Sequence, residues 1–416
     1  MKNRKLVSFK LDILLDGLDC DFRSLRKKGN ISNYRVNKIR VSDRHFIDPE
    51  SNLRKYIPDE ISIETNNFKT ISKVYYNIKS NLLLKYSIKE DCLYIVNKKN
   101  LKRYPFKLNF IPLKSFAKKT ITLPSGRKIK AGEIVTPVSI DRLSINPFDG
   151  CTMWLTGKQC KFCGANPNRV IGPRIKPSVN DLKNYMSVAL WWKSNKKDIV
   201  SAVEQSFKLL TREEFEPHLH LTITTGYLYG YEWEILLDLL ARVKSYMDLS
   251  KVDSHLTLMP PKSMEVLKRA KRLGIKNVAY NLEVFQKAKF KEICPGKDLE
   301  VEYEDFINWL KKSVKVFGWG NVRTNFVLGL ENPKKLIRGC QELAKYGVVS
   351  DYTIFYRRPA SVIQTRSRDA LNKKDIIEFT EKLVKIYKKN GFKPFTCRLS
   401  SRTSIANDLF GDDDGS

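Results

Sequence analysis

Residues 150–164 of the chain read Gly150-Cys151-Thr152-Met153-Trp154-Leu155-Thr156-Gly157-Lys158-Gln159-Cys160-Lys161-Phe162-Cys163-Gly164. This stretch holds three of the chain's eight cysteines, and an aromatic residue, Phe162, directly precedes the last of the three. Three thiolates on one glycine-flanked loop can hold three irons of a [4Fe–4S] cluster and leave the fourth iron without a protein ligand. The spacing therefore predicts that Cys151, Cys160 and Cys163 are metal ligands, with one iron open to a small molecule.

Composition favours a globular protein. The chain has 416 residues, of which 42 % are hydrophobic and 29 % are charged. It contains no run of about 18 apolar residues, and Lys10 and Asp12 interrupt the apolar stretch near the N-terminus, so neither a membrane span nor a secretory signal is expected. We expect a cytoplasmic protein with no membrane partner. In that reducing compartment, clustered cysteines are more often metal ligands than disulfides.

The charge is strongly positive, with a formal net value of +31. It is concentrated between Lys98 and Lys130, where no acidic residue occurs and where Tyr104, Phe106, Phe110 and Phe116 are interleaved with the basic residues. Basic residues mixed with aromatic ones are typical of surfaces that bind nucleic acid. RNA or another polyanion is therefore one candidate partner. The other interpretation is a lysine-rich composition spread over solvated surfaces.

Three parts follow one another along the chain. Residues 1–135 are expected to form a basic, strand-rich accessory domain, because residues 7–13, 60–64 and 92–96 alternate apolar and polar side chains, and a Pro-Ser-Gly turn within 121–129 predicts a hairpin. Residues 136–365 are expected to form a β/α domain. Residues 366–416 are expected to add a helix over 373–389 and a tail that complete or cap it.

The middle part alternates short apolar strands with amphipathic helices, which predicts an α/β fold built as a partial or complete parallel β/α barrel of the TIM type. A first strand is expected over 138–145, and further strands over 219–224, 253–259, 277–282, 322–328 and 352–356. Helices are expected over 198–210, 233–246, 263–273, 303–317 and 334–346. Chemistry in such barrels lies at the carboxyl ends of the strands, where the cysteine loop would follow the first strand.

These motifs resemble the radical S-adenosylmethionine (radical SAM) superfamily. The usual family motif is Cys-x3-Cys-x2-Cys with an aromatic residue before the third cysteine, and Cys160-Lys-Phe-Cys163 matches its second half. The first interval has eight residues where three are usual, a spacing similar to that of the Elongator-type catalytic subunits. Residues 283–285, 293–297 and 316–322 are most similar to the biotin-synthase-like branch.

The resemblance implies a binding site for S-adenosylmethionine beside the cluster. Phe162 belongs to the cluster motif, and Thr224-Thr225-Gly226 stands where the family contacts the methionine amino group. Asn281 and Glu283 stand where the family places polar side chains toward the ribose and the methionine carboxylate. Val327 and Gly329 lie in a segment similar to the one that packs on the adenine.

The implied activity is reductive cleavage of S-adenosylmethionine to methionine and a 5′-deoxyadenosyl radical. The radical would abstract hydrogen from a small-molecule biosynthetic substrate, with electrons from an external donor such as flavodoxin or ferredoxin. No catalytic acid or base is identified from the sequence. A second cluster of the kind found in part of that branch is not expected, because only Cys397 remains near the C-terminus.

Two alternatives stay open. A radical SAM enzyme could modify RNA through the basic N-terminal domain. A zinc-stabilised nucleic-acid-binding protein could instead use Cys151, Cys160 and Cys163 with His218 or Cys294 as the fourth ligand. Cys294 and Cys340 are most simply interpreted as buried cysteines without a chemical role. The loop of Cys294 would nevertheless lie at the carboxyl ends of the barrel strands, where the chemistry is expected.

Overall fold

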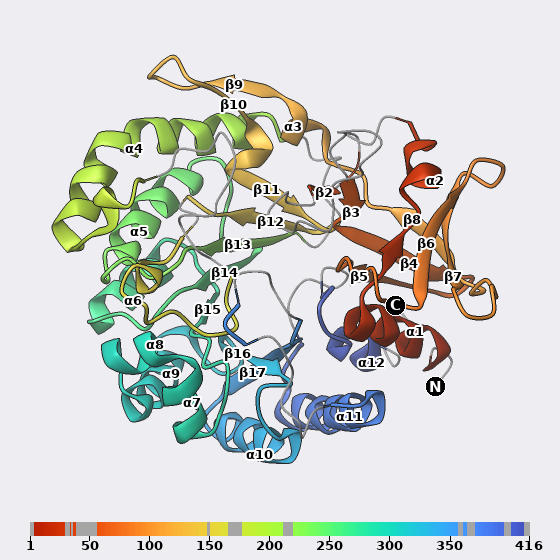
Figure 1. Ribbon diagram of the computed structural model, residues 1–416. Coiled ribbons are helices and arrows are strands. Elements are labelled where there is room, and N and C mark those ends of the chain that lie inside the picture. The colour runs from red at the N-terminus through yellow and green to blue at the C-terminus, as the bar shows by residue number, and fades with distance from the viewer. Residues whose placement is uncertain are drawn as a thin grey trace. The chain divides into compact units, whose positions relative to one another are not determined.

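The computed structural model describes residues 4–29, 34, 36–38, 56–147, 150–164, 177–210, 219–356, 361–363, 371–394 and 401–411 (Figure 1). The chain divides into two compact units. The smaller unit combines residues 1–113 with 399–416, and the larger unit spans 114–398. The division thus falls at residues 113 and 398, where the sequence suggested 135 and 365.

The smaller unit is built on a six-stranded sheet with the strand order β1-β6-β7-β8-β4-β5. Its helices are α1 (Arg4–Asp16), α2 (Phe22–Arg26) and α12 (Ala406–Phe410). Its strands are β1 (Asp19–Cys20), β4 (Glu60–Thr65), β5 (Phe68–Lys73), β6 (Leu82–Ser87), β7 (Cys92–Asn97) and β8 (Lys107–Phe110), and a separate pair joins β2 (Val36–Lys38) to β3 (Tyr56–Pro58). The strands expected over 60–64 and 92–96 are present as β4 and β7.

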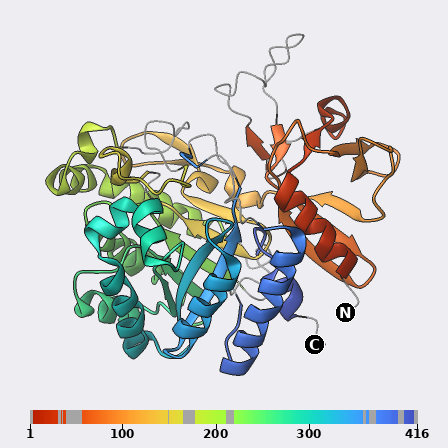
Figure 2. The same cartoon turned by 60° about the horizontal axis from the view of Figure 1, so that its bottom comes forward.

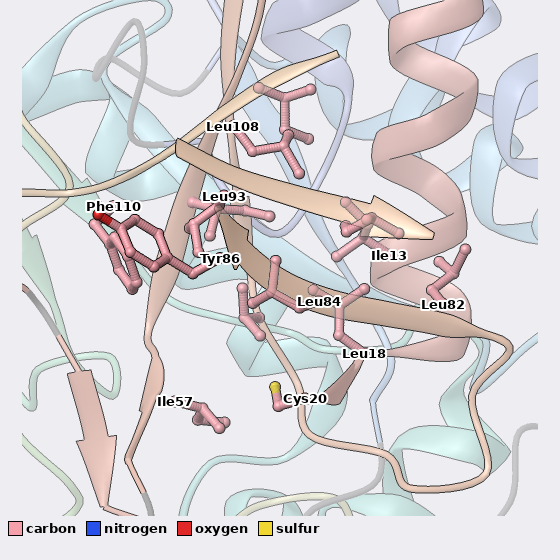
Figure 3. Close-up of a cluster of buried hydrophobic side chains, with 14 of the residues drawn as sticks. Ile13, Leu18, Cys20, Ile57, Leu82, Leu84, Tyr86, Leu93, Leu108 and Phe110 are labelled. Atoms are coloured by element: carbon pink, nitrogen blue, oxygen red, sulfur yellow. The ribbon is translucent and has the colours of Figure 1, made fainter. Parts of the chain in front are cut away.

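The strand expected over residues 7–13 is wrong, because these residues lie in helix α1. Leu6, Phe9 and Ile13 recur at helical spacing and are buried in the core beneath the sheet, together with Leu84 and Leu93 (Figure 3). In a stretch as short as residues 7–13, apolar residues can fit both the strand period and the helix period. Packing of the apolar side of the helix against the sheet decides in favour of the helix.

The basic stretch from Lys98 to Lys130 does not form one surface of one domain, because it is divided between the two units at residue 113. Its aromatic residues are largely committed to packing. Tyr104 and Phe106 lie against Phe9 with ring centroids 4.6 Å and 4.7 Å apart, and Phe110 and Phe116 are buried. The rings of Phe110 and Phe116 are therefore not available to stack on bases, and those of Tyr104 and Phe106 are only partly exposed.

The larger unit contains a seven-stranded sheet with the order β11-β12-β13-β14-β15-β16-β17. Its strands are β11 (Val135–Val138), β12 (Arg142–Ile145), β13 (His220–Thr224), β14 (Asp253–Thr257), β15 (Asn277–Ala279), β16 (Val322–Leu328) and β17 (Val348–Ile354). From β12 to β17 every neighbouring pair is parallel. The α/β fold class with a partial parallel barrel is confirmed.

The first expected strand, over 138–145, is in fact two strands. β11 and β12 pair antiparallel, and the chain turns between Val138 and Arg142 with Ser139 at a positive φ of 54°. A hairpin of two four-residue strands carries the same apolar alternation as one longer strand, so the periodicity did not reveal the turn. β12 is the strand that leads into the cysteine loop.

Helices lie along one side of this sheet (Figures 1 and 2). They are α4 (Tyr185–Lys208), α5 (Glu232–Val243), α6 (Met264–Arg272), α7 (Lys287–Ile293), α8 (Pro295–Glu300), α9 (Tyr303–Phe317), α10 (Pro333–Ala344) and α11 (Lys373–Asn390). Before them come α3 (Ser115–Lys118) and the expected hairpin of β9 (Thr120–Thr122) and β10 (Lys128–Lys130). Helix α4 begins 13 residues earlier than expected, where the Asn184 side chain accepts a hydrogen bond from the Ser187 amide and caps it.

The two faces of the parallel sheet differ in polarity. One face packs against the helices. On this face the Tyr280 hydroxyl is hydrogen-bonded to Ser313 of α9, and the Tyr352 hydroxyl is hydrogen-bonded to Thr380 of α11. The other face is polar, since Thr222 pairs in register with His255, Thr224 with Thr257, and Asn325 with Asp351. A polar face directed away from the helices lines the inside of the partial barrel. Among the described residues, no helix has the length and apolarity needed to cross a bilayer.

Candidate active site

The cysteine loop is fastened to the end of strand β13. The Thr152 amide and hydroxyl both donate to the Tyr227 carbonyl, at 3.0 Å and 2.9 Å. A Cβ atom on Gly226 would overlap the Gly150 carbonyl oxygen and lie 2.8 Å from Cys151 Cβ. The predicted segment Thr224-Thr225-Gly226 therefore lies directly against the start of the loop, and only glycine fits at its third position.

The far end of the loop is fastened to the segment between α7 and α8. The Lys161 amide donates to the Ile293 carbonyl at 2.9 Å, and the Gly296 amide donates to the Lys158 carbonyl at the same distance. Gly296 is again a close approach, because a Cβ atom there would lie 2.5 Å from the Lys158 carbonyl oxygen. Both ends of the loop are thus held by backbone contacts to neighbouring βα connections.

The three thiols of the loop act on one another electrostatically. Burial raises the pKa of Cys151 to about 12, and negative charge on Cys160 and Cys163 acts in the same direction. A hydrogen bond from Cys294 lowers the pKa of Cys160 against the effect of burial, and the Lys297 ammonium group assists. The charge state of Cys151 thus depends on the other two thiols of the loop.

The donors of the loop are all thiols, which suit an iron–sulfur cluster. Within the described part of the chain, no three His, Cys, Asp or Glu side chains converge tightly enough to hold a metal ion. The ligands of one zinc ion all lie about 2.3 Å from it, whereas each cysteine of a [4Fe–4S] cluster binds its own iron and the sulfurs stand further apart. The zinc alternative through Cys294 thus gains no support, and the alternative through His218 lies outside the described residues.

Glu283 follows β15 and is held in an unusual backbone conformation. Its φ is 69°, its amide donates to the Asn325 carbonyl at 3.0 Å, and the Val327 amide donates to its carbonyl at 2.8 Å. A non-glycine residue at positive φ is costly and is concentrated at functional sites. These bonds bring two of the predicted residues, Glu283 and Val327, side by side at the ends of neighbouring strands.

Sequence reasoning missed the partner of Glu283. The Lys297 ammonium lies 2.8 Å from the Glu283 carboxylate and 2.6 Å from the Asn281 carbonyl oxygen, and both side chains are largely buried. Burial alone would lower the pKa of Lys297, but the negative charges of Glu283 and Cys160 outweigh it and raise that pKa. The signal in the sequence was Pro295-Gly296-Lys297, which opens α8 beside Cys294.

The remaining predicted residues lie around this centre. Phe162 is partly exposed on the loop between Cys160 and Cys163, and Gly329 follows β16 with a positive φ of 115°. Thr224 donates to the Thr257 carbonyl at 3.1 Å. Cys397 lies outside the described residues.

A second polar layer lies nearer the amino ends of the strands. His220 and His255 are buried with ring centroids 5.8 Å apart, and burial lowers both pKa values, that of His255 to about 3. The positive charges of Arg142 and Arg323 act in the same direction. Arg323 itself is held by Asp351 at 2.7 Å and 2.9 Å. Both histidines are therefore neutral in the folded protein at neutral pH.

Comparison with known proteins gives one sequence match and several structural ones. No family model matches the chain. The chain is 29 % identical over 136 residues to the bacteriochlorophyllide c C-7(1)-hydroxylase of Chlorobaculum limnaeum, a match that covers 32 % of this chain and 33 % of that protein. The match thus spans about a third of the relative's length.

Solved structures with a similar arrangement include two of HydG, a maturase of the [FeFe]-hydrogenase. One has a TM-score of 0.41 at 13 % identity, covering 64 % of this chain and 53 % of that chain. The other, from Carboxydothermus hydrogenoformans, has a TM-score of 0.40 at 13 % identity and covers 64 % and 55 %. Methylornithine synthase (PylB) follows with a TM-score of 0.39 at 15 % identity, covering 67 % and 77 %. The sequence match covers about a third of each chain, and the solved structures share the arrangement at 13–15 % identity.

Proposed function

We propose that the chain is a radical SAM enzyme whose cluster is held by Cys151, Cys160 and Cys163. One observation carries the proposal: a loop with three thiols is fastened at the carboxyl ends of β12 and β13, against Thr224-Thr225-Gly226. The cluster, when bound, supplies the electron that breaks the C5′–S bond of S-adenosylmethionine and releases a 5′-deoxyadenosyl radical.

The chain's own residues bind and orient the cosubstrate. The missing side chain of Gly226 leaves room for the Gly150 carbonyl and so sets the loop against the end of β13. The ends of β15 and β16 present Asn281, Glu283 and Val327, the last two joined by a backbone hydrogen bond. The Lys297–Glu283 pair can hold the amino and carboxylate groups of a methionine moiety by charge-assisted hydrogen bonds. The polar inner face of the sheet then encloses the target carbon and excludes water.

The substrate in this proposal is a small molecule. The matched hydroxylase acts, by its name, on a bacteriochlorophyllide, and hydrogen abstraction from an unactivated C–H bond fits such a modification. A cytoplasmic location and a donor such as flavodoxin or ferredoxin are part of the proposal. RNA as substrate is not carried further, because two aromatic residues of the basic stretch are buried and the other two are partly buried against Phe9.

The decisive experiment is anaerobic reconstitution with iron and sulfide, followed by dithionite and S-adenosylmethionine. We expect 5′-deoxyadenosine from the wild type and its loss in Cys151→Ala, Cys160→Ala and Cys163→Ala. Cys92→Ala is the matched control, because Cys92 lies in the smaller unit. Normal product from any of the three loop variants would remove that cysteine from the ligand set, and no product from the wild type would end the proposal.

Glu283→Gln tests the cosubstrate site separately. It keeps the side-chain size and one acceptor oxygen but removes the charge that faces Lys297, so we expect the cluster to be retained and S-adenosylmethionine to bind at least about 10-fold more weakly. Equilibrium binding to the reconstituted protein measures this, with Glu342→Gln on the exposed surface of α10 as control. An unchanged dissociation constant would exclude Glu283 from the site.

A further inference from the structure

Cys160 and Cys294 lie opposite each other although 133 residues separate them. Two backbone hydrogen bonds flank them, from the Lys161 amide to the Ile293 carbonyl and from the Gly296 amide to the Lys158 carbonyl, each 2.9 Å long. These two bonds bracket residues 160 and 294 and hold the two cysteines in neighbouring backbone segments. The Cys294 side chain acts on the Cys160 sulfur as a hydrogen-bond donor, which lowers the pKa of Cys160 and raises that of Cys294.

The direction of this bond follows from the chemistry of a cluster ligand. A cysteine bound to iron is a thiolate with no hydrogen to donate, so the bond must run from the Cys294 S–H to the Cys160 sulfur. Cys294 has no exposed surface, and no water competes for its hydrogen. The neighbouring Lys297 ammonium donates to Glu283 at 2.8 Å and to the Asn281 carbonyl at 2.6 Å and acts on Cys160 through its charge, whereas the Cys294 thiol acts on it as a hydrogen-bond donor.

We propose that Cys294 is a positioning residue of the cluster: its S–H donates to the Cys160 sulfur and thereby raises the reduction potential. Hydrogen bonds to the sulfur ligands are one of the factors that set iron–sulfur potentials, because they stabilise the more negative, reduced state. The effect makes the cluster easier to reduce by an external donor. The inference rests on the proposed function, since it assumes a cluster bound through Cys160.

The test is the midpoint potential of the reconstituted protein, measured by a redox titration followed by electron paramagnetic resonance. Cys294→Ala removes the donor, and we expect full iron content with a more negative midpoint than in the wild type. Cys294→Ser keeps a donor of similar size, and we expect its midpoint at or above the wild-type value because an O–H donates more strongly than an S–H. Cys340→Ala is the matched control, because Cys340 is equally buried but lies in α10.

The outcomes separate the two proposals. An equal midpoint in Cys294→Ala and the wild type, with normal iron content, would overturn the role of Cys294 and leave the proposed function standing. Loss of iron from both Cys294 variants would identify a fourth ligand and overturn the inference as well. If the alanine variant does not fold, a serine variant with a midpoint below the wild-type value is sufficient to refute it. Absence of a cluster from the wild type would refute both proposals.

Discussion

At the residue scale, the missing side chain of Gly226 shapes the site as much as the thiols do. A methyl group there would overlap the Gly150 carbonyl and press on Cys151. We predict that Gly226→Ala displaces the loop, lowers the iron content after reconstitution by more than half and destabilises the larger unit by about 1–3 kcal/mol, the range for overpacking. Iron analysis and denaturant unfolding measure the two effects.

Gly411→Ala is the control for this substitution. Its Cβ atom would make only an ordinary contact, 3.4 Å from the Asn407 carbonyl oxygen, and its φ of −82° suits any residue. We expect iron content and stability close to the wild type. If Gly226→Ala behaved in the same way, the close packing of loop and strand would not be needed to hold the site.

Individual residues differed in how far the sequence revealed them. Cys151, Cys160 and Cys163 could be proposed from spacing alone, because they lie within one loop. Cys294 and Lys297 could not be assigned a partner, because their contacts with Cys160 and Glu283 arise only when separate βα connections are brought together. Local patterns identify ligand sets that are contiguous, and they do not identify neighbours supplied by the fold.

At the scale of elements, periodicity was reliable where a strand or helix was long and one-sided. Helix α9 begins and ends where its apolar stripe predicts, and β16 likewise. The prediction from periodicity was wrong for α1 and for the β11–β12 hairpin, because their short segments fit two patterns equally well. In both places, packing against other elements determines which secondary structure forms. A local sequence pattern carries no information on that packing.

The buried histidines on β13 and β14 give these strands a pH dependence. His255 has a pKa of about 3 in the fold and about 6.5 when unfolded, and that of His220 is lowered as well. Below pH 6.5 the unfolded chain binds protons that the folded chain excludes, so stability is fully present above pH 6.5 and falls as the pH decreases. Buried Glu232 opposes this, because its pKa is raised to about 7 and its contribution is lost as the pH rises through 7.

The pKa of buried Glu331 is raised as well and acts in the same direction as Glu232, so we predict that the two histidines make the free energy of unfolding of the larger unit rise with pH between 5 and 6 and that the two glutamates partly offset this rise. His255→Gln should reduce this slope, because it removes one group with a depressed pKa. Urea unfolding followed at several pH values between 5 and 8 provides the test, and Glu232→Gln should steepen the slope. A slope that stays the same in His255→Gln would show that the histidine is protonated in the folded protein.

At the scale of the whole molecule, the two ends of the chain meet in the smaller unit. The Lys10 ammonium on α1 is only 1 % exposed and lies 2.7 Å from the Asp408 carboxylate on α12, and it also donates to Thr70 and to the Ser401 carbonyl. A sequence pattern assigns such residues to separate regions, because they are 398 positions apart. Burial of this pair explains why residues 401–411 belong with the N-terminal sheet.

Removal of one partner leaves a buried charge without compensation, so we predict that Asp408→Ala destabilises the smaller unit by about 3–5 kcal/mol, whereas Lys10→Met combined with Asp408→Leu costs much less. All six tryptophans lie between residues 154 and 319, within the larger unit. Hydrogen exchange in β4–β8 should therefore accelerate while the tryptophan fluorescence transition stays unchanged.

Lys69→Ala is the control. It breaks the more exposed pair with Glu64, and it should lower the free energy of unfolding by at most about 1 kcal/mol. A shift of the tryptophan transition in Asp408→Ala would mean that the two units unfold as one.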